Sequence, residues 1–142
     1  MGAAVLSFVG LLIGAGLQFM FTTHLENKKH RREQRSTAYA DYLKCVSELA
    51  NLGHQRQSQE GRELGSRTAD AKCRISLYGA GAVIRAFADF ERMGAGMKTP
   101  EQREAFAKMV VEMRRDAIGE EVADAADVQI VILGSGSHLP PA

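Results

Sequence analysis

The first 23 residues carry no charged side chain, although the 142-residue sequence contains 18 lysines and arginines and 17 aspartates and glutamates. Residues 2–21 read GAAVLSFVGLLIGAGLQFMF, and a helix of this length rises about 30 Å, the thickness of the bilayer hydrocarbon core. A buried core helix would show a polar face, but here only Ser7 and Gln18 are polar. A cleaved signal peptide would begin with positive charge and end at a small-residue cleavage site. We therefore expect a retained transmembrane helix within residues 1–23.

A basic segment follows at once and sets the expected orientation. Residues 24–35 carry two glutamates and five cations, which are Lys28, Lys29, Arg31, Arg32 and Arg35. Positive charge beside a span stays in the cytoplasm. We expect a single-pass protein of the inner membrane with its N-terminus outside and residues 24–142 in the cytoplasm. The same cations could hold anionic lipid headgroups at about 1 kcal/mol each, but a topology signal on a solvated helix face is the simpler interpretation.

Small and polar residues share one face of the expected span. They recur at steps of three and four residues, at Ala3, Ser7, Gly10, Gly14 and Gln18. Small residues let two helix backbones approach closely in lipid, and a Gln side chain can donate a hydrogen bond across the interface. This face predicts self-association or pairing with a partner span.

Helical periodicity appears again after the basic segment. In residues 36–52, apolar side chains recur at steps of three and four, at Tyr39, Tyr42, Leu43, Val46, Leu49 and Ala50. No proline interrupts residues 1–99, so the membrane helix could continue to about residue 53. Residues 54–67 are polar and include two glycines, which indicates a loop or a frayed helix end.

Residues 69–93 permit two interpretations. A strand over residues 73–78 followed by Gly79-Ala80-Gly81 would imitate the start of a dinucleotide-binding loop, but Ile84 stands where the third glycine belongs. Alternatively, one helical face continues through Ile75, Tyr78, Gly79, Ala82, Val83, Ala86, Phe87 and Phe90. We favour a kinked or capped pair of helices.

The next helix has the best-defined boundaries. Thr99, Pro100 and Gln102 form an N-cap, a proline at the first helical position and a capping box, and Gly119 suits the C-terminal end. Its apolar stripe consists of Ala105, Phe106, Met109, Val110, Met113 and Ala117.

The C-terminal end is acidic, because no lysine or arginine follows Arg115. Residues 128–133 (VQIVIL) form a short strand or a packing helix, and we favour the helix because a strand would have only residues 73–78 to pair with. The sequence thus predicts an all-α fold with four parts: a transmembrane helix (1–23), a basic juxtamembrane helix (24–53), a helical bundle (54–118), and an acidic segment with a flexible tail (119–142).

The span, the basic helix, the segment ISLYGAGAVIRAF and a helix ending in EMRRDAIG together resemble a family of small bacterial single-span inner-membrane proteins. The resemblance covers most of the chain and implies a bacterial membrane-anchored protein with a helical cytoplasmic domain. Its motifs are packing motifs without known chemistry, so it implies no activity.

Catalytic and metal-binding patterns are missing from the sequence. The four histidines (His24, His30, His54 and His138) lack metal-ligand spacing, and the two cysteines, Cys45 and Cys73, are far apart in the chain. Arg114 and Arg115 beside Asp116 could bind an anion, but solvation of a helix surface explains them better. We expect no catalytic residue, cofactor or metal, and the net charge of +1 argues against nucleic acid as a partner.

Two classes of function remain. The first is a membrane-anchored interaction or scaffold protein that binds a protein partner or copies of itself. The alternative is a membrane effector whose oligomerised span permeabilises the bilayer. We favour the first, because one span with a single Gln18 offers little to line a pore.

Overall fold

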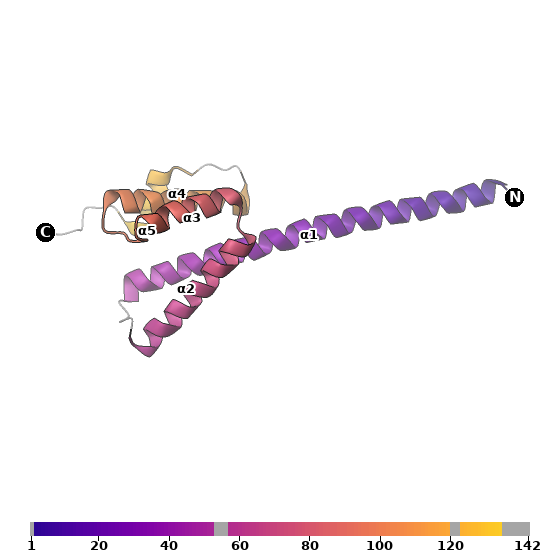
Figure 1. The fold of residues 1–142 in the computed structure, drawn as a ribbon. Helices are drawn as coiled ribbons and strands as arrows, with labels where there is room; N and C mark the ends of the chain where they lie inside the picture. Colours follow the sequence, from indigo (N-terminus) through magenta and orange to yellow (C-terminus); the bar gives the residue numbers. More distant parts are fainter. Residues whose placement is uncertain (1, 53–56, 120–122, 135–142) are drawn as a thin grey trace. The chain divides into compact units, whose positions relative to one another are not determined.

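A computed structural model describes residues 2–52, 57–119 and 123–134, with the backbone alone for residues 2–16, 51 and 52 (Figure 1). The described part folds into five helices and contains no strand. They are α1 (Gly2–Leu52), α2 (Gln59–Tyr78), α3 (Gly81–Arg92), α4 (Pro100–Ile118) and α5 (Ala125–Leu133). The prediction of an all-helical fold is confirmed. The chain divides into two compact units, Met1–Gln34 and Arg35–Ala142.

The first unit contains the N-terminal part of α1. Its side chains over residues 17–33 are exposed, and the hydroxyls of Thr22 and Thr23 donate to carbonyl oxygens four residues earlier, at 2.8 and 2.9 Å. Among the residues whose side chains are described, no helix is both long enough and apolar enough to cross a membrane. Most of the predicted span falls on residues 1–16, which lie outside this set, so the span stays a prediction.

In the second unit, α2 begins earlier than the sequence indicated. The Ser58 hydroxyl caps it by accepting a hydrogen bond from the Gly61 N–H at 3.0 Å. The prediction of a loop or a frayed helix end over residues 54–67 is therefore wrong from Gln59 onward, and residues 54–56 lie outside the described residues. A polar stretch of this kind becomes helical when a capping side chain supplies the missing partner of the first turn.

The junction between α2 and α3 depends on a glycine. The Gly79 N–H donates to the Ile75 carbonyl at 2.7 Å, and a Cβ added to Gly79 would lie 2.5 Å from that oxygen. Ala80 is extended and starts α3. The predicted pair of helices over residues 69–93 is confirmed, whereas the strand and the dinucleotide-binding loop are wrong.

Helix α4 starts as its sequence predicted. The Thr99 hydroxyl accepts from the Gln102 N–H at 3.2 Å, and the Gln102 side-chain oxygen accepts from the Thr99 N–H at 3.2 Å. At its end Gly119 has a φ of +100°, a conformation that favours glycine. Residues 128–133 belong to α5, so the favoured helix is confirmed there too.

The core of the second unit joins the predicted apolar stripes. Its buried residues are Ala38, Tyr39, Tyr42, Ala71, Ile75, Val83, Phe90, Ala105, Phe106, Met109, Val110 and Met113. Helices α3 and α4 lie side by side, and the Phe90 and Phe106 rings meet at a centroid distance of 5.4 Å (Figure 1).

Three members of the predicted stripes are exposed, namely Leu49, Ala50 and Tyr78. Leu49 is 56% exposed because it shares a surface hollow with Gly61 and Gly65, which have no side chains to cover it. Tyr78 is 41% exposed because it is the last residue of α2, where no further helical turn packs beside it.

Ion pairs supplement the short apolar face of α2. Arg74 contacts Asp41 of α1 at 2.7 Å, Arg67 pairs with Glu48 of the same helix, and Lys72 pairs with Glu91 of α3. Such partly exposed pairs contribute about 0–1 kcal/mol each, so they orient α2 more than they stabilise it.

Candidate functional site

An apolar groove of about 510 Å³ lies between α1, α4 and α5 in the second unit. Its walls come from the part of α1 after residue 35, from the last turns of α4 and from α5. The apolar lining residues are Tyr39, Ala40, Leu43, Val110, Met113, Ala117, Ile118, Ala123, Val128, Val131 and Ile132. The polar lining residues are Ser36, Arg114 and Asp127. An apolar groove with a few polar groups at its walls is the usual form of a binding site.

Helix α5 forms the outer wall of the groove. The Asp124 side chain accepts from the Ala126 N–H at 2.9 Å and caps the helix, and Gly134 ends it with a φ of +79°. Val128 and Leu133 pack against the core. The opposite side of the helix is apolar as well, with Val131 83% exposed and Ile130 54% exposed. One face of α5 therefore stabilises the fold, and the other presents apolar surface to solvent.

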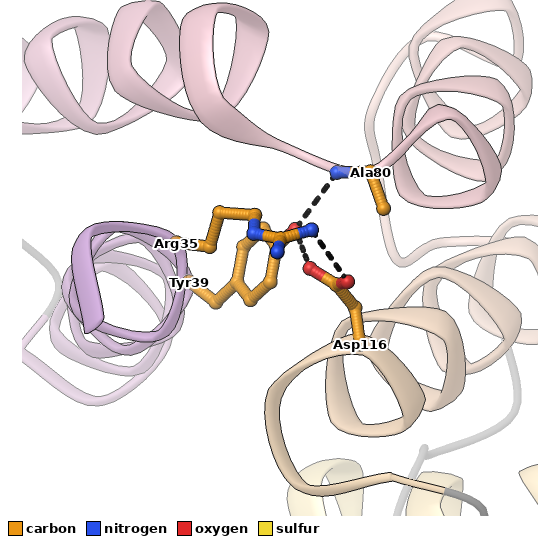
Figure 2. A network of polar contacts seen from close by, with 4 residues as sticks. All are labelled: Arg35, Tyr39, Ala80 and Asp116. Atoms are coloured by element: carbon orange, nitrogen blue, oxygen red, sulfur yellow. Dashed lines mark hydrogen bonds and ion pairs between the residues drawn. The ribbon is translucent and has the colours of Figure 1, made fainter. Parts of the chain in front are cut away.

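A network of polar contacts borders the groove at Tyr39 and holds three elements together (Figure 2). The Tyr39 hydroxyl donates to Asp116 Oδ2 at 2.7 Å and accepts from the Ala80 N–H at 3.2 Å. Arg35 Nη1 donates to Asp116 Oδ1 at 2.8 Å. Asp116 of α4 thus binds two side chains of α1, and through Tyr39 it is linked to the junction between α2 and α3. We call these four residues the Asp116 network.

The electrostatics of the Asp116 network keep the Tyr39 phenol protonated. Burial, together with the hydrogen bond to Asp116, raises the pKa of Tyr39 to about 12, although the hydrogen bond from the Ala80 N–H lowers it. Burial also raises the pKa of Tyr42. A phenol held neutral in this way serves as a hydrogen-bond donor, so the network is a structural contact.

A larger groove of about 700 Å³ lies between α3 and α4, but its walls carry charges of both signs. Arg92 pairs with Asp89, and Lys108 contacts Glu104 at 2.7 Å. Because these charges compensate one another along the surface, this groove offers no preference for an anion or a cation. The apolar groove is the stronger candidate despite its smaller volume.

The predicted membrane-association face lies mostly outside the side chains that the structure describes. Ala3, Ser7, Gly10 and Gly14 belong to the part of α1 for which only the helical backbone is described, and Gln18 is an exposed residue of the same helix. Its role in association stays a prediction.

The basic segment is divided between the two units. Lys28, Lys29, Arg31 and Arg32 are exposed in the first unit, where Lys29 lies 3.9 Å from Glu33. Arg35 belongs to the second unit, and its side chain is 27% exposed beside Asp116. Contact of these cations with lipid stays a prediction.

Sequence patterns predicted the helices around the apolar groove but did not indicate the groove itself. The signal was present in residues 128–133, because Gln129 is the one polar residue of this run, and a helix with apolar side chains on several sides needs cover on more than one face. Asp116 lies 81 positions after Arg35, with which it forms an ion pair, and 77 positions after Tyr39, from which it accepts a hydrogen bond. No local sequence pattern predicts contacts over such separations.

Within the described residues, no three histidine, cysteine, aspartate or glutamate side chains gather closely enough to hold a metal ion. Cys45 is buried and Cys73 is exposed, and both are free thiols. Comparisons with protein-family models, with curated proteins and with solved structures find no match. The resemblance to small bacterial inner-membrane proteins therefore stays a prediction.

Proposed function

We propose that the chain is a membrane-anchored helical interaction protein whose second unit binds another protein through the apolar groove. The observation that carries this proposal is the exposure of Val131 (83%), Ile118 (56%) and Ile130 (54%) on and beside the groove. Contiguous apolar surface of this kind marks interaction sites, because water contact with it is unfavourable. The proposed role is binding, without a catalytic step.

Anchoring is inferred from the sequence. The 23 uncharged residues supply the span, and Lys28, Lys29, Arg31 and Arg32 supply the positive flank that stays in the cytoplasm. The proposed location is the inner membrane of a bacterial cell, with the N-terminus outside and the second unit in the cytoplasm. Pairing of spans through the face of Gly10 and Gly14 would add to partner binding.

Anchoring is tested by fractionating bacterial cells that express the full chain and by reporter fusions at its C-terminus. We expect the chain in the membrane fraction, a bright fluorescent fusion and an inactive alkaline phosphatase fusion. The matched variant Leu11→Arg with Leu12→Arg places charge within the span and should move the chain to the soluble fraction. Recovery of the unaltered chain in the soluble fraction would contradict anchoring.

Partner binding is tested by introducing a photo-crosslinking amino acid in place of Val131 in the full chain. The matched control places the same amino acid at Ser66, an exposed residue of α2 outside the groove. We expect crosslinked protein products from position 131 and none from position 66. Equal yields from both positions would show that the groove is no binding site.

The membrane-effector alternative predicts a different result. Controlled expression of the full chain would then depolarise the cells, whereas residues 24–142 alone would not. We favour the interaction protein, because Gln18 is the one strongly polar side chain within the uncharged segment.

A further inference from the structure

The outer face of α5 remains apolar after the helix has packed on the core. Val128 and Leu133 face the core, while Val131 and Ile132 line the groove and are 83% and 40% exposed. Helix α5 contains the polar residues Asp127 and Gln129, but it carries apolar side chains both toward the core and toward the groove, and cover on the second side would remove these side chains from water. The second unit therefore presents the exposed apolar side chains of α5 and the apolar groove on the same surface.

Charge on this surface argues for a second copy as the occupant. Arg114 belongs to the α4 wall of the groove and Asp127 to the α5 wall. In a two-fold symmetric pair, the same surface meets itself, so Arg114 of each copy can face Asp127 of the other, and apolar residues near the axis meet their own copies. One surface is thereby complementary to itself in both charge and polarity.

The same charges disfavour a lipid surface as the occupant. No lysine or arginine follows Arg115, and Asp124 and Asp127 lie at the start of α5. The cytoplasmic leaflet is anionic and attracts basic segments. The anionic leaflet would repel the acidic start of α5, which lies beside the apolar face.

Anchoring in one membrane would favour this association. The largest apolar patch of a typical monomeric protein covers roughly 300–600 Å², and a contact of that size is smaller than the roughly 800 Å² per partner of a stable complex. Two chains held in one membrane meet at a raised effective concentration, so a weak contact becomes populated. We propose that the apolar groove and the exposed face of α5 bind the same surface of a second copy of the chain, in a two-fold symmetric contact. This inference rests on the proposed function and names the partner of its groove.

The first test is cysteine crosslinking of the full chain in bacterial membranes. Cys73→Ser removes the exposed thiol and leaves the buried Cys45 in place. In this background, Val131→Cys should give a crosslinked dimer, whereas the control Ser66→Cys on α2 should not. A dimer yield at position 131 no higher than at position 66 would overturn the two-fold contact.

The second test exchanges charge between copies. Each of the variants Arg114→Asp and Asp127→Arg, added to Val131→Cys, should lower its own dimer yield at least about fivefold, because both contacts then join like charges. When the two variants are expressed together with tags of different size, the mixed dimer should return to the yield of Val131→Cys alone, since both of its contacts join opposite charges. This recovery would also show that both variants fold. A mixed dimer no stronger than the two like-charged dimers would overturn the inference.

The outcomes separate this inference from the proposed function. Crosslinks from position 131 to a different protein, without dimers of this chain, would refute the second copy and leave partner binding intact. Loss of the chain from the membrane fraction would instead refute the anchoring on which the inference rests.

Discussion

Replacing Asp116 with alanine tests the Asp116 network most directly. The change removes the acceptor of two side-chain hydrogen bonds, at 2.7 Å from the Tyr39 hydroxyl and at 2.8 Å from Arg35 Nη1. Tyr39 is only 3% exposed, so water replaces its lost partner poorly. The Arg35 side chain is 27% exposed and recovers much of its hydration.

The expected cost follows from this difference in exposure. A hydrogen bond to a charged group contributes about 1.5–3 kcal/mol when the remaining partner stays buried, and a partly exposed ion pair adds about 0–1 kcal/mol. Asp116→Ala should therefore lower the free energy of unfolding by about 2–4 kcal/mol. In double-mutant cycles, the coupling of Asp116 to Tyr39 (measured with Tyr39→Phe) should exceed its coupling to Arg35 (measured with Arg35→Ala).

The assay is urea unfolding of the full chain in detergent micelles, followed by circular dichroism. The matched control is Glu104→Ala in the same helix, which removes an exposed carboxylate that lies 2.7 Å from Lys108. The control should change stability by less than about 0.5 kcal/mol. Equal effects of the two variants, or no coupling between Asp116 and Tyr39, would refute the argument that burial of the hydroxyl gives this network its strength.

Three further predictions concern the core, the pH response and the span. Phe106→Ala should cost about 3–5 kcal/mol of unfolding free energy in the same urea assay, because its side chain is fully buried. The free energy of unfolding should fall as the pH rises from about 10 through about 12, because the unfolded tyrosine loses its proton near pH 10 while the folded Tyr39 has a pKa of about 12. Urea midpoints measured across this pH range test the prediction, and a flat profile would contradict it. Gly10→Leu with Gly14→Leu should weaken association in a bacterial two-hybrid reporter by separating the helix backbones, whereas the control Leu12→Ile should not.

Local sequence patterns predicted the elements that depend on neighbouring residues. The Thr99–Gln102 capping box and the glycine after Ile118 define α4 within a few positions, and both were readable without tertiary information. The helix pair around Gly79 was also predictable, because a continuous apolar face runs through it. These signals operate over one or two helical turns.

The start of α2 was not predictable in the same way. Its first turns bury only Leu64, so no apolar stripe marks them. Tertiary partners supply what the sequence lacks there, including the pair between Arg67 and Glu48, which lie 19 positions apart. Helix propensity alone favours a loop here, because the residues are polar or glycine, whereas ion-pair partners distant in the sequence favour the helix.

The basic segment shows why charge patterns need the fold before they can be assigned. Lys28 to Arg32 and Arg35 form one run in the sequence, and the positive-flank rule treats them alike. The boundary between the two compact units falls after Gln34, and Arg35 is the first cation on the far side of it. There the charge of Arg35 meets Asp116, a residue that the sequence analysis assigned to the helical bundle (54–118) and not to the basic helix. Since Arg35 is engaged within its own unit, its removal should destabilise the second unit, whereas removal of Lys28 should alter only topology or lipid contact. The two substitutions, compared by urea unfolding and by the reporter fusions, separate the two roles, and equal effects in both assays would contradict the division.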